Sequence, residues 1–411
     1  MKTHDLVAQG RAVKAAATQL AQASNERRRA VLLFVAERLE SSLEELLALN
    51  AREVEAYPDS GPGRDRLVLT PARVASMAQA LREVANSPDP LFERVDVDVR
   101  PNGLNVERLR VPLGVIGVVY ENRPNVTCDV AGLCVRSGNA AYLRGSSSAI
   151  ETNRFLVSLW HEALEKESLP AAAVSLVEET SHETAVAFMQ MTDVLDCLVP
   201  RGGPSLIAAM REHARVPYVL DGDGNCHVYV DSSADLSMAL GIVKNAKTSR
   251  PGVCNAAETL LVHADVASLF LARLEAELAE VELRGDERSR SIVARMLVAS
   301  EDDYAREFLD LILAVKVVDS LDEAIAHVAR YGTGHSEAIV TQSDENAEAW
   351  VRRVDAAAVL VNASTRFIDG GELGLGGEVG ISTQKLHARG PMGLRELTCL
   401  KWVVRGEGQI R

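Results

Sequence analysis

From Gly114 onward, short apolar runs alternate along the chain with longer amphipathic stretches. The first run, residues 115–120 (Val-Ile-Gly-Val-Val-Tyr), is apolar throughout, as expected of a strand that is buried on both faces of a sheet. Short strands separated by helices form βαβ units, so this alternation predicts an α/β fold with a parallel, doubly wound sheet. The further predicted strands are residues 140–143, 173–177, 194–199 and 218–220, and the predicted helices are residues 149–166, 182–190 and 204–213.

A second series of the same kind follows Asp231. Because a chain of 411 residues is too long for one ordinary core, we expect two such α/β domains, which meet near residue 230. The predicted helices of this series are residues 236–247, 266–278, 321–330 and 346–353, and the predicted strands are residues 259–262, 313–318, 338–341 and 358–361.

The first hundred residues favour helices instead. Ser24 or Asn25 can cap a helix whose apolar residues recur every three to four positions as far as Leu47, and Thr70-Pro71 is a typical helix start. Residues 103–111 alternate partly in polarity, which predicts an exposed strand that is a candidate for pairing between subunits. A final strand is predicted at residues 398–404.

Composition disfavours several classes of protein and site. No apolar run approaches the ~20 residues of a membrane span, and the N-terminus lacks a signal sequence, so we expect a cytoplasmic protein. The net charge of −14 disfavours nucleic acid or an anionic membrane as a partner. Scattered cysteines without paired short spacings disfavour a disulfide framework and a zinc site, so no metal is expected. The cysteines are Cys128, Cys134, Cys197, Cys226, Cys254 and Cys399.

One of these residues, Cys254, lies in a polar loop shaped by Pro251 and Gly252, at the junction of a predicted helix and a predicted strand. A thiol at such a junction can be exposed, and Lys247 and Arg250 upstream can favour its thiolate form. Structural cysteines usually lie inside apolar periodicity. The loop position on its own leaves a catalytic and a structural role open.

Polar residues follow several predicted strands, where α/β folds build ligand sites. The amide of Asn122 could donate to an oxyanion, although Asn and Pro also favour a plain turn. Arg144, before a predicted helix, suits a ribose phosphate or is simply solvated. Arg201-Gly202-Gly203 joins a strand to a helix, and its N–H groups can cradle a phosphate without the usual Gly-x-Gly-x-x-Gly pattern.

The C-terminal part of the chain carries a further polar cluster. Asn362, Ser364 and Arg366 follow the predicted strand 358–361, and a glycine-rich segment then leads to Ser382-Thr383. Hydroxyl groups, an arginine and flexible glycines suit phosphate or carboxylate recognition, although a long glycine loop can also be merely mobile. An anionic substrate also fits the arginines that recur in these motifs, which are Arg123, Arg144, Arg201, Arg250 and Arg366.

These motifs together resemble one enzyme family. Residues 249–259 (Ser-Arg-Pro-Gly-Val-Cys-Asn-Ala-Ala-Glu-Thr) resemble the nucleophile segment of the γ-glutamyl phosphate reductases, which belong to the aldehyde dehydrogenase superfamily. Residues 326–339 are similar to a signature stretch of the same family. Residues 121–124 (Glu-Asn-Arg-Pro) occupy the place of the superfamily's Pro-Trp-Asn-Phe-Pro, and Arg144 replaces the Lys of its Lys-Pro-Ser. The resemblance extends over essentially the whole chain.

The resemblance implies an aldehyde-dehydrogenase-like fold with two doubly wound α/β domains and a small β oligomerisation arm. The implied parts are a dinucleotide-binding domain (residues 1–100 and 122–230), a catalytic domain (231–390) and the arm (101–121 and 391–411). It also implies an NADPH-dependent reductase of L-glutamyl 5-phosphate that makes L-glutamate 5-semialdehyde and phosphate in proline biosynthesis. The implied partners are further copies of the chain and the upstream glutamate kinase.

The resemblance also implies roles for single residues. Cys254 would be the nucleophile and Asn122 would hold the oxyanion. Glu307 would accept a ribose hydroxyl, because residues 306–308 lie where the superfamily has Glu-Ile-Phe-Gly-Pro. The other implied cofactor residues are Arg144, Arg201, Gly202 and Gly203, and the implied substrate residues are Arg123, Asn362, Ser364, Arg366, Ser382 and Thr383.

One departure from the superfamily pattern bears on the reaction. Asp221 falls where many members carry the Glu that activates a deacylating water, and it is one carbon shorter. Since phosphate is a good leaving group and no water attacks the thioester, a reductase of this kind does not need that base. The alternative function is NAD(P)-dependent oxidation of another small anionic aldehyde, which would need it. His335 either contacts a ligand or satisfies backbone groups.

Overall fold

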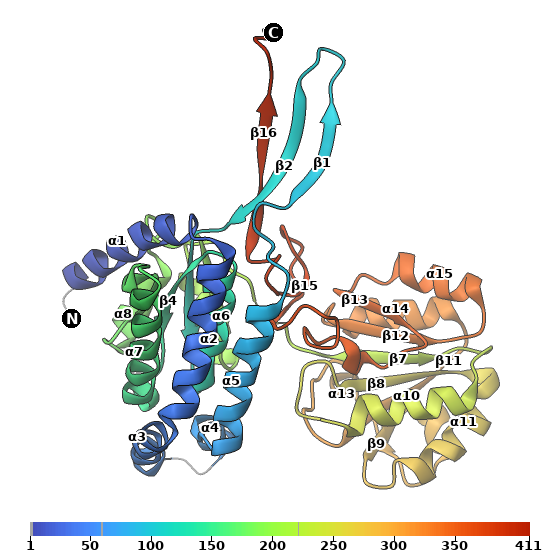
Figure 1. The fold of residues 1–411 in the computed structure, drawn as a ribbon. Coiled ribbons are helices and arrows are strands. Elements are labelled where there is room, and N and C mark those ends of the chain that lie inside the picture. Colours follow the sequence, from blue (N-terminus) through green and yellow to red (C-terminus); the bar gives the residue numbers. More distant parts are fainter. Residues whose placement is uncertain (1–2, 59–60, 221) are drawn as a thin grey trace. The chain divides into compact units, whose positions relative to one another are not determined.

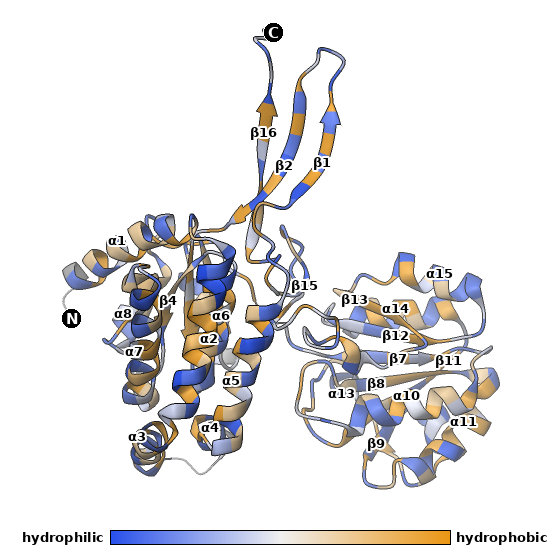
Figure 2. Ribbon diagram, in the orientation of Figure 1, coloured by the Kyte–Doolittle hydropathy of each residue, from blue (hydrophilic) through white to orange (hydrophobic). Residues whose placement is uncertain are grey.

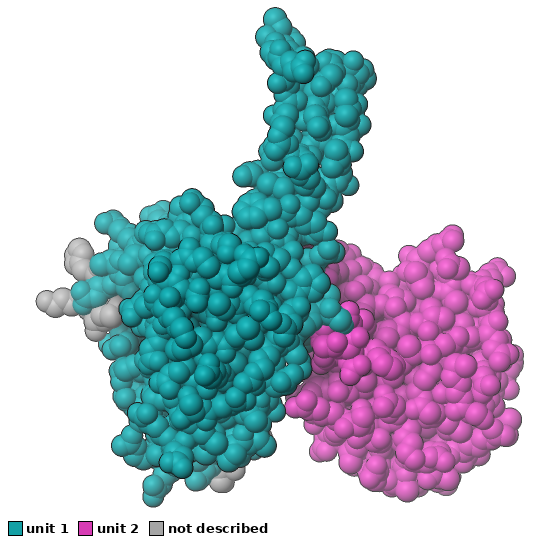
Figure 3. Space-filling view, in the orientation of Figure 1, with its two compact units in different colours: residues 1–220, 374–380, 392–411 teal, residues 221–373, 381–391 magenta. Residues whose placement is uncertain are grey.

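A computed structural model describes residues 3–58, 61–220 and 222–411 (Figure 1). The chain divides into two compact units, each of which is formed by segments distant in sequence (Figure 3). Unit 1 comprises Met1–Leu220, Gly374–Gly380 and Met392–Arg411, and unit 2 comprises Asp221–Leu373 and Ile381–Pro391. Among the described residues, no helix is both long enough and apolar enough to cross a membrane.

Unit 1 begins with helices, as predicted. The side chain of Ser24 accepts a hydrogen bond from the Arg27 N–H, and Thr70 caps its helix in the same way. The single helix expected as far as Leu47 is wrong, because the helix ends at Ser41, whose hydroxyl donates to the Arg38 carbonyl, and a new helix begins at Leu43. These helices are α1 (Thr3–Leu20), α2 (Asn25–Ser41), α3 (Leu43–Ala56), α4 (Pro62–Leu67) and α5 (Pro71–Asn86).

The centre of unit 1 is a parallel four-stranded sheet with the strand order β5-β4-β3-β6, which confirms the predicted doubly wound topology. The predicted strand at 218–220 is wrong, because only a single bridge joins Leu198 to Tyr218. The strands are β3 (Val115–Tyr120), β4 (Ala140–Arg144), β5 (Val174–Leu176) and β6 (Cys197–Arg201). The helices are α6 (Pro124–Arg136), η1 (Ser147–Ala149), α7 (Ile150–Lys166), η2 (Ala171–Ala173), α8 (His182–Met189) and α9 (Pro204–His213).

A separate antiparallel sheet, with the order β1-β2-β16, extends from unit 1 (Figure 1). Its strands are β1 (Arg94–Val99), β2 (Asn105–Pro112) and β16 (Thr398–Arg405). Figure 2 shows hydrophobic and hydrophilic residues alternating along β1 and β2. The N-terminal part of this arm differs in its bounds from the expected segment of residues 101–121. It begins with β1 at Arg94 and ends with β2 at Pro112, and β3 is fully buried in the central sheet.

Unit 2 contains a parallel sheet of seven strands in the order β10-β9-β11-β8-β7-β12-β13. Its strands are β7 (Cys226–Val230), β8 (Ala257–His263), β9 (Glu282–Gly285), β10 (Leu297–Val298), β11 (Ile312–Val318), β12 (Ser336–Val340) and β13 (Ala358–Val361). β7 is buried inside this sheet, so unit 2 begins at Asp221, about ten residues before the boundary expected near residue 230.

Helices cover both faces of this sheet (Figure 1). Successive residues of β8 point to opposite faces, so that Leu260 packs toward α10 and α11 while Leu261 packs toward α14 and α15. The helices are α10 (Leu236–Thr248), α11 (Ala264–Glu277), α12 (Glu287–Ile292), α13 (Glu301–Tyr304), α14 (Leu321–Tyr331), α15 (Asp344–Arg353) and η3 (Thr365–Phe367). A small antiparallel pair, β14 (Ile381–Ser382) and β15 (Gly390–Pro391), completes unit 2.

Candidate active site

The loop that carries Cys254 joins the end of α10 to the start of β8, as the sequence predicted. A turn in which the Ala256 N–H donates to the Val253 carbonyl brings the chain from the loop into the strand. Cys254 is partly exposed, and Cys399 lies exposed on β16. The other cysteines are buried, namely Cys128, Cys134, Cys197 and Cys226. In unit 2, therefore, Cys254 is the cysteine that is open to a reactant.

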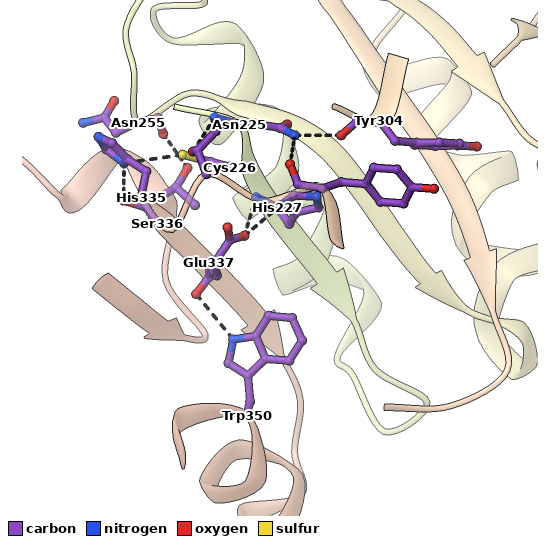
Figure 4. A network of polar contacts seen from close by, with 12 residues as sticks. Asn225, Cys226, His227, Asn255, Tyr304, His335, Ser336, Glu337 and Trp350 are labelled. Carbon is purple, nitrogen blue, oxygen red and sulfur yellow. Dashed lines mark hydrogen bonds and ion pairs between the residues drawn. The ribbon is translucent and has the colours of Figure 1, made fainter. Parts of the chain in front are cut away.

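The chain before β7 lies directly against this loop. A Cβ added to Gly224 would overlap the carbonyl oxygen of Cys254 and would lie 2.6 Å from its Cα, so only glycine fits there. The Cys226 thiol donates a hydrogen bond to the same carbonyl, with an Sγ–O distance of 3.1 Å. His335, before β12, places its Nδ1 atom 3.6 Å from Cys226 Sγ and 2.8 Å from Ser336 Oγ (Figure 4). The site in unit 2 is thus built at the amino ends of β7, β8 and β12.

Burial decides which of the two neighbouring thiols can react. Low-polarity surroundings disfavour a thiolate, and they raise the pKa of Cys226 well above its ordinary value, with the charge of Glu337 as a further cause. Cys226 therefore stays a neutral thiol and acts as a hydrogen-bond donor to the loop. This leaves Cys254 as the candidate nucleophile.

A buried polar network stiffens the strand ends beneath the loop (Figure 4). The backbone N–H and the Nδ1 atom of His227 both contact Glu337 Oε2, at 2.8 and 2.9 Å, and neither side chain is exposed. The Asn225 amide donates to the carbonyls of Tyr304 and Tyr331, at 2.7 and 2.8 Å. These bonds join β7 to β12 and join Asn225 to the last residues of α13 and α14, so they fix the segment that holds Gly224.

The adjacent pair Cys226-His227 does not act as a unit. Since successive side chains of a strand point to opposite faces, Cys226 contacts His335 and His227 contacts Glu337. Within the described ranges, no three His, Cys, Asp or Glu side chains gather as a metal site would require. Sequence reasoning missed Gly224, Asn225 and Glu337, although a glycine just before an apolar strand was a usable signal.

Glu307, the predicted ribose acceptor, lies beside the same segment. Its carboxylate accepts a hydrogen bond from the Gly224 N–H at 3.0 Å. Asp221, whose role the sequence left open, lies outside the described residues. The structure thus brings Glu307 to the Cys254 loop through Gly224.

The predicted substrate residues fall into two groups. The Arg366 guanidinium donates to Asn255 Oδ1 and to Ser249 Oγ, so it contacts the Cys254 loop on both sides of the cysteine. Ser364 caps the short helix that carries Arg366. The second group lies around β14, where the Ser382 hydroxyl accepts a hydrogen bond from the Gln384 N–H.

Thr383 lies beside the segment that precedes β7, because a Cβ on Gly222 would lie 2.9 Å from Thr383 Oγ1. Asn362 lies elsewhere. Both atoms of its side-chain amide bond to the backbone of Thr341, at 2.9 Å each, at the carboxyl ends of β12 and β13. Cys254 precedes the amino end of β8 in the same parallel sheet, so Asn362 lies at the opposite ends of the strands. We therefore leave Asn362 out of the proposed site.

In unit 1, the predicted residues do gather at the carboxyl ends of the strands. Asn122 follows β3 with a φ of +38°, and its amide donates to the Tyr57 hydroxyl at 2.7 Å and accepts from Ser146 Oγ at 3.0 Å. Arg123 is the N-cap residue of α6. Arg144, at the end of β4, donates to the carbonyls of Thr180 and Ser181, and its buried Nε has no hydrogen-bond partner among the described residues.

The turn before α9 already contacts a carboxylate of the protein itself. Glu121 Oε2 accepts a hydrogen bond from the Gly203 N–H at 2.9 Å, and a Cβ on Gly202 would lie 2.7 Å from the same oxygen. Arg201 is the last residue of β6 and leads into this turn. A carboxylate therefore occupies the position where the helix start would receive a phosphate.

The chain as a whole is similar to a known enzyme family. The model of the aldehyde dehydrogenase family matches residues 2–311. The gamma-glutamyl phosphate reductase of Heliobacterium modesticaldum is 51% identical over 99% of both chains, and that of Syntrophomonas wolfei is 52% identical over 99% of this chain and 98% of its own. The crystal structure of the Thermotoga maritima gamma-glutamyl phosphate reductase matches with a TM-score of 0.96, at 44% identity and 99% coverage of both chains. The chain therefore belongs to the aldehyde dehydrogenase family and, within it, to the gamma-glutamyl phosphate reductases.

Proposed function

We propose that this protein reduces L-glutamyl 5-phosphate with NADPH to L-glutamate 5-semialdehyde and phosphate, in proline biosynthesis. The observation that carries the proposal is the partly exposed Cys254 on a loop held by Gly224, Cys226 and Arg366. Relatives about half identical over nearly the whole chain carry the name of this reductase. The loop provides the nucleophile, and the names of the relatives indicate the substrate.

The reaction begins when the Cys254 thiolate attacks the acyl carbon. The carbon–oxygen bond to phosphate then breaks, phosphate leaves with the bonding electrons, and a thioester remains on the cysteine. When bound, NADPH supplies the hydride that converts the thioester to a thiohemiacetal. The thiohemiacetal collapses, which releases the aldehyde and restores the Cys254 thiolate. Asn122 stays the predicted oxyanion donor, together with a backbone N–H.

The end of β4 fits the phosphate of a dinucleotide. The Arg144 guanidinium is half-buried there and has an Nε atom that meets no acceptor within the described residues, so it can hold a 2′-phosphate. The Gly203 N–H, by contrast, is already satisfied by Glu121. The predicted contact of the Gly202-Gly203 turn with a phosphate requires Glu121 to give up that bond.

Replacing Arg144 with alanine is expected to weaken NADPH more than NADH, because only NADPH carries the 2′-phosphate. A charged hydrogen bond of ~1.5–3 kcal/mol corresponds to roughly ten- to hundredfold selectivity. Fluorescence titration of both cofactors measures the effect, with Arg154→Ala on the exposed face of α7 as the matched control. Equal losses for both cofactors would contradict the role of Arg144.

Replacing Arg366 with alanine separates two roles for that residue. If Arg366 binds the substrate, the KM for glutamate semialdehyde or phosphate rises in the reverse reaction, by roughly tenfold or more, and NADP affinity stays almost unchanged. If Arg366 only holds Asn255 and Ser249 in place, the melting temperature falls and both KM values stay unaltered. We expect the KM effect. Arg352→Ala, at an exposed surface pair, is the control.

A coupled forward assay tests the proposed function. Glutamate, ATP and a purified glutamate kinase generate the unstable acyl phosphate in the same cuvette, and NADPH oxidation follows at 340 nm as ~1 turnover per second or faster. Oxidation that does not depend on the kinase would contradict the proposal. A homo-oligomer formed through the β1-β2-β16 arm, an association with the kinase and a cytoplasmic location stay predictions.

A further inference from the structure

A buried ion pair closes the two ends of the Cys254 loop. Lys247 lies in the last turn of α10 and Glu258 is the second residue of β8. Lys247 Nζ lies 2.7 Å from Glu258 Oε2, and neither side chain is exposed to solvent. One residue precedes the cysteine and the other follows it, so their bond joins the segment that enters the loop to the segment that leaves it.

The same carboxylate reaches a third segment. Glu258 Oε1 accepts a hydrogen bond from the Leu309 N–H at 3.2 Å, where the chain turns with a φ of +56° at Leu309. Glu307, two positions earlier, holds the Gly224 N–H, and Gly224 lies against the carbonyl of Cys254. The contacts thus run from the ion pair through this turn and back to the cysteine.

A buried ion pair contributes little net free energy to the stability of a core. Two buried charges lose their hydration, and an apolar pair of the same volume often packs as stably. Burial raises the pKa of Glu258 to about 7 although the Lys247 charge opposes this, and burial also lowers the pKa of Lys247. What an apolar pair cannot supply is a directional bond that fixes α10 relative to β8.

We propose that Lys247 and Glu258 are positioning residues for the nucleophile. Their bond fixes both ends of the loop and so holds Cys254 Sγ where it meets the acyl carbon. The effect on the reaction rests on the proposed function. The claim that the pair fixes the loop does not depend on that function. The opposing view is that the pair only stabilises the fold of unit 2.

The test is the double variant Lys247→Met/Glu258→Gln. Methionine and glutamine keep the volumes, and the glutamine oxygen can still accept from the Leu309 N–H, so that mainly the ionic bond is lost. The matched control is Lys244→Met/Glu277→Gln, which removes an exposed pair of 2.8 Å from the preceding turn of α10.

Two measurements separate positioning from mere stability. We expect kcat of the reverse reaction to fall by roughly ten- to hundredfold with KM within about twofold, as for a misplaced reacting group. Hydrogen exchange should become faster in residues 248–257 and stay unchanged in the strands of unit 2, while the control behaves as wild type. A double variant with more than half of the wild-type kcat would overturn the inference, and so would faster exchange throughout unit 2.

Failure of the proposed function would look different. In that case the wild-type chain shows no phosphate-dependent turnover, yet exchange in residues 248–257 still reports on the pair, because it needs no substrate. If the double variant does not fold, Glu258→Asp alone is the milder change, since it keeps both charges in the core and shortens only the side chain that meets Lys247. We then expect a smaller loss of kcat, again at unchanged KM, and a wild-type kcat in this variant would contradict the role.

Discussion

Replacing Cys254 with serine is expected to lower kcat by more than ~10³ while NADPH binding stays nearly intact, because a hydroxyl without an adjacent base is a poor nucleophile. The reverse assay measures kcat, and fluorescence titration measures the affinity for NADPH. Cys399→Ser, at the exposed cysteine of β16, controls for the general loss of a thiol. If Cys254→Ser kept a tenth of wild-type activity, Cys254 would not be the nucleophile.

Replacing Gly224 with alanine is expected to cost nearly as much activity through geometry alone. The new Cβ would overlap the carbonyl oxygen of Cys254, and backbone atoms cannot swing aside as the end of a flexible side chain can. A displacement of the loop by about 1 Å is expected to lower kcat by ~10²-fold. Overpacking should also lower stability by ~1–3 kcal/mol.

The matched control for this variant lies on α10. A Cβ on Gly241 would meet no atom within 4 Å, so Gly241→Ala is expected to keep full activity and to raise stability by ~0.5–1 kcal/mol. Steady-state kinetics and thermal melting of both variants measure the difference. A wild-type kcat in Gly224→Ala would show that the loop position is not critical.

Much of the fold could be predicted because buried strands are recognisable in the sequence as short, continuous apolar runs. Residues 115–120 are apolar throughout and form β3, and the alternation that follows sets the parallel order of both sheets. The misses were local. Nothing in the apolar spacing marks the break at Ser42, and Tyr218 forms only one bridge because the chain pairs there too briefly to make a strand.

The site could be predicted only where its signal is local. Cys254 stands out in a polar loop, but its contacts with Gly224 and Cys226 arise because β7 and β8 are neighbours in the sheet. That order is a long-range property. Arg144 lies at the carboxyl end of β4, where α/β folds build ligand sites, whereas the Cys254 loop lies at the amino ends of its strands, opposite to Asn362.

The measurement that tests the central claim most directly is the reverse reaction with phosphate as the variable. With L-glutamate 5-semialdehyde and NADP⁺, we predict NADPH formation that saturates with phosphate and is negligible without it, because phosphate must cleave the Cys254 thioester. Hydroxylamine should trap the product as a hydroxamate, as expected of an acyl phosphate. NADPH formation at the same rate without phosphate, with glutamate as the product, would contradict the account and would identify an ordinary aldehyde dehydrogenase.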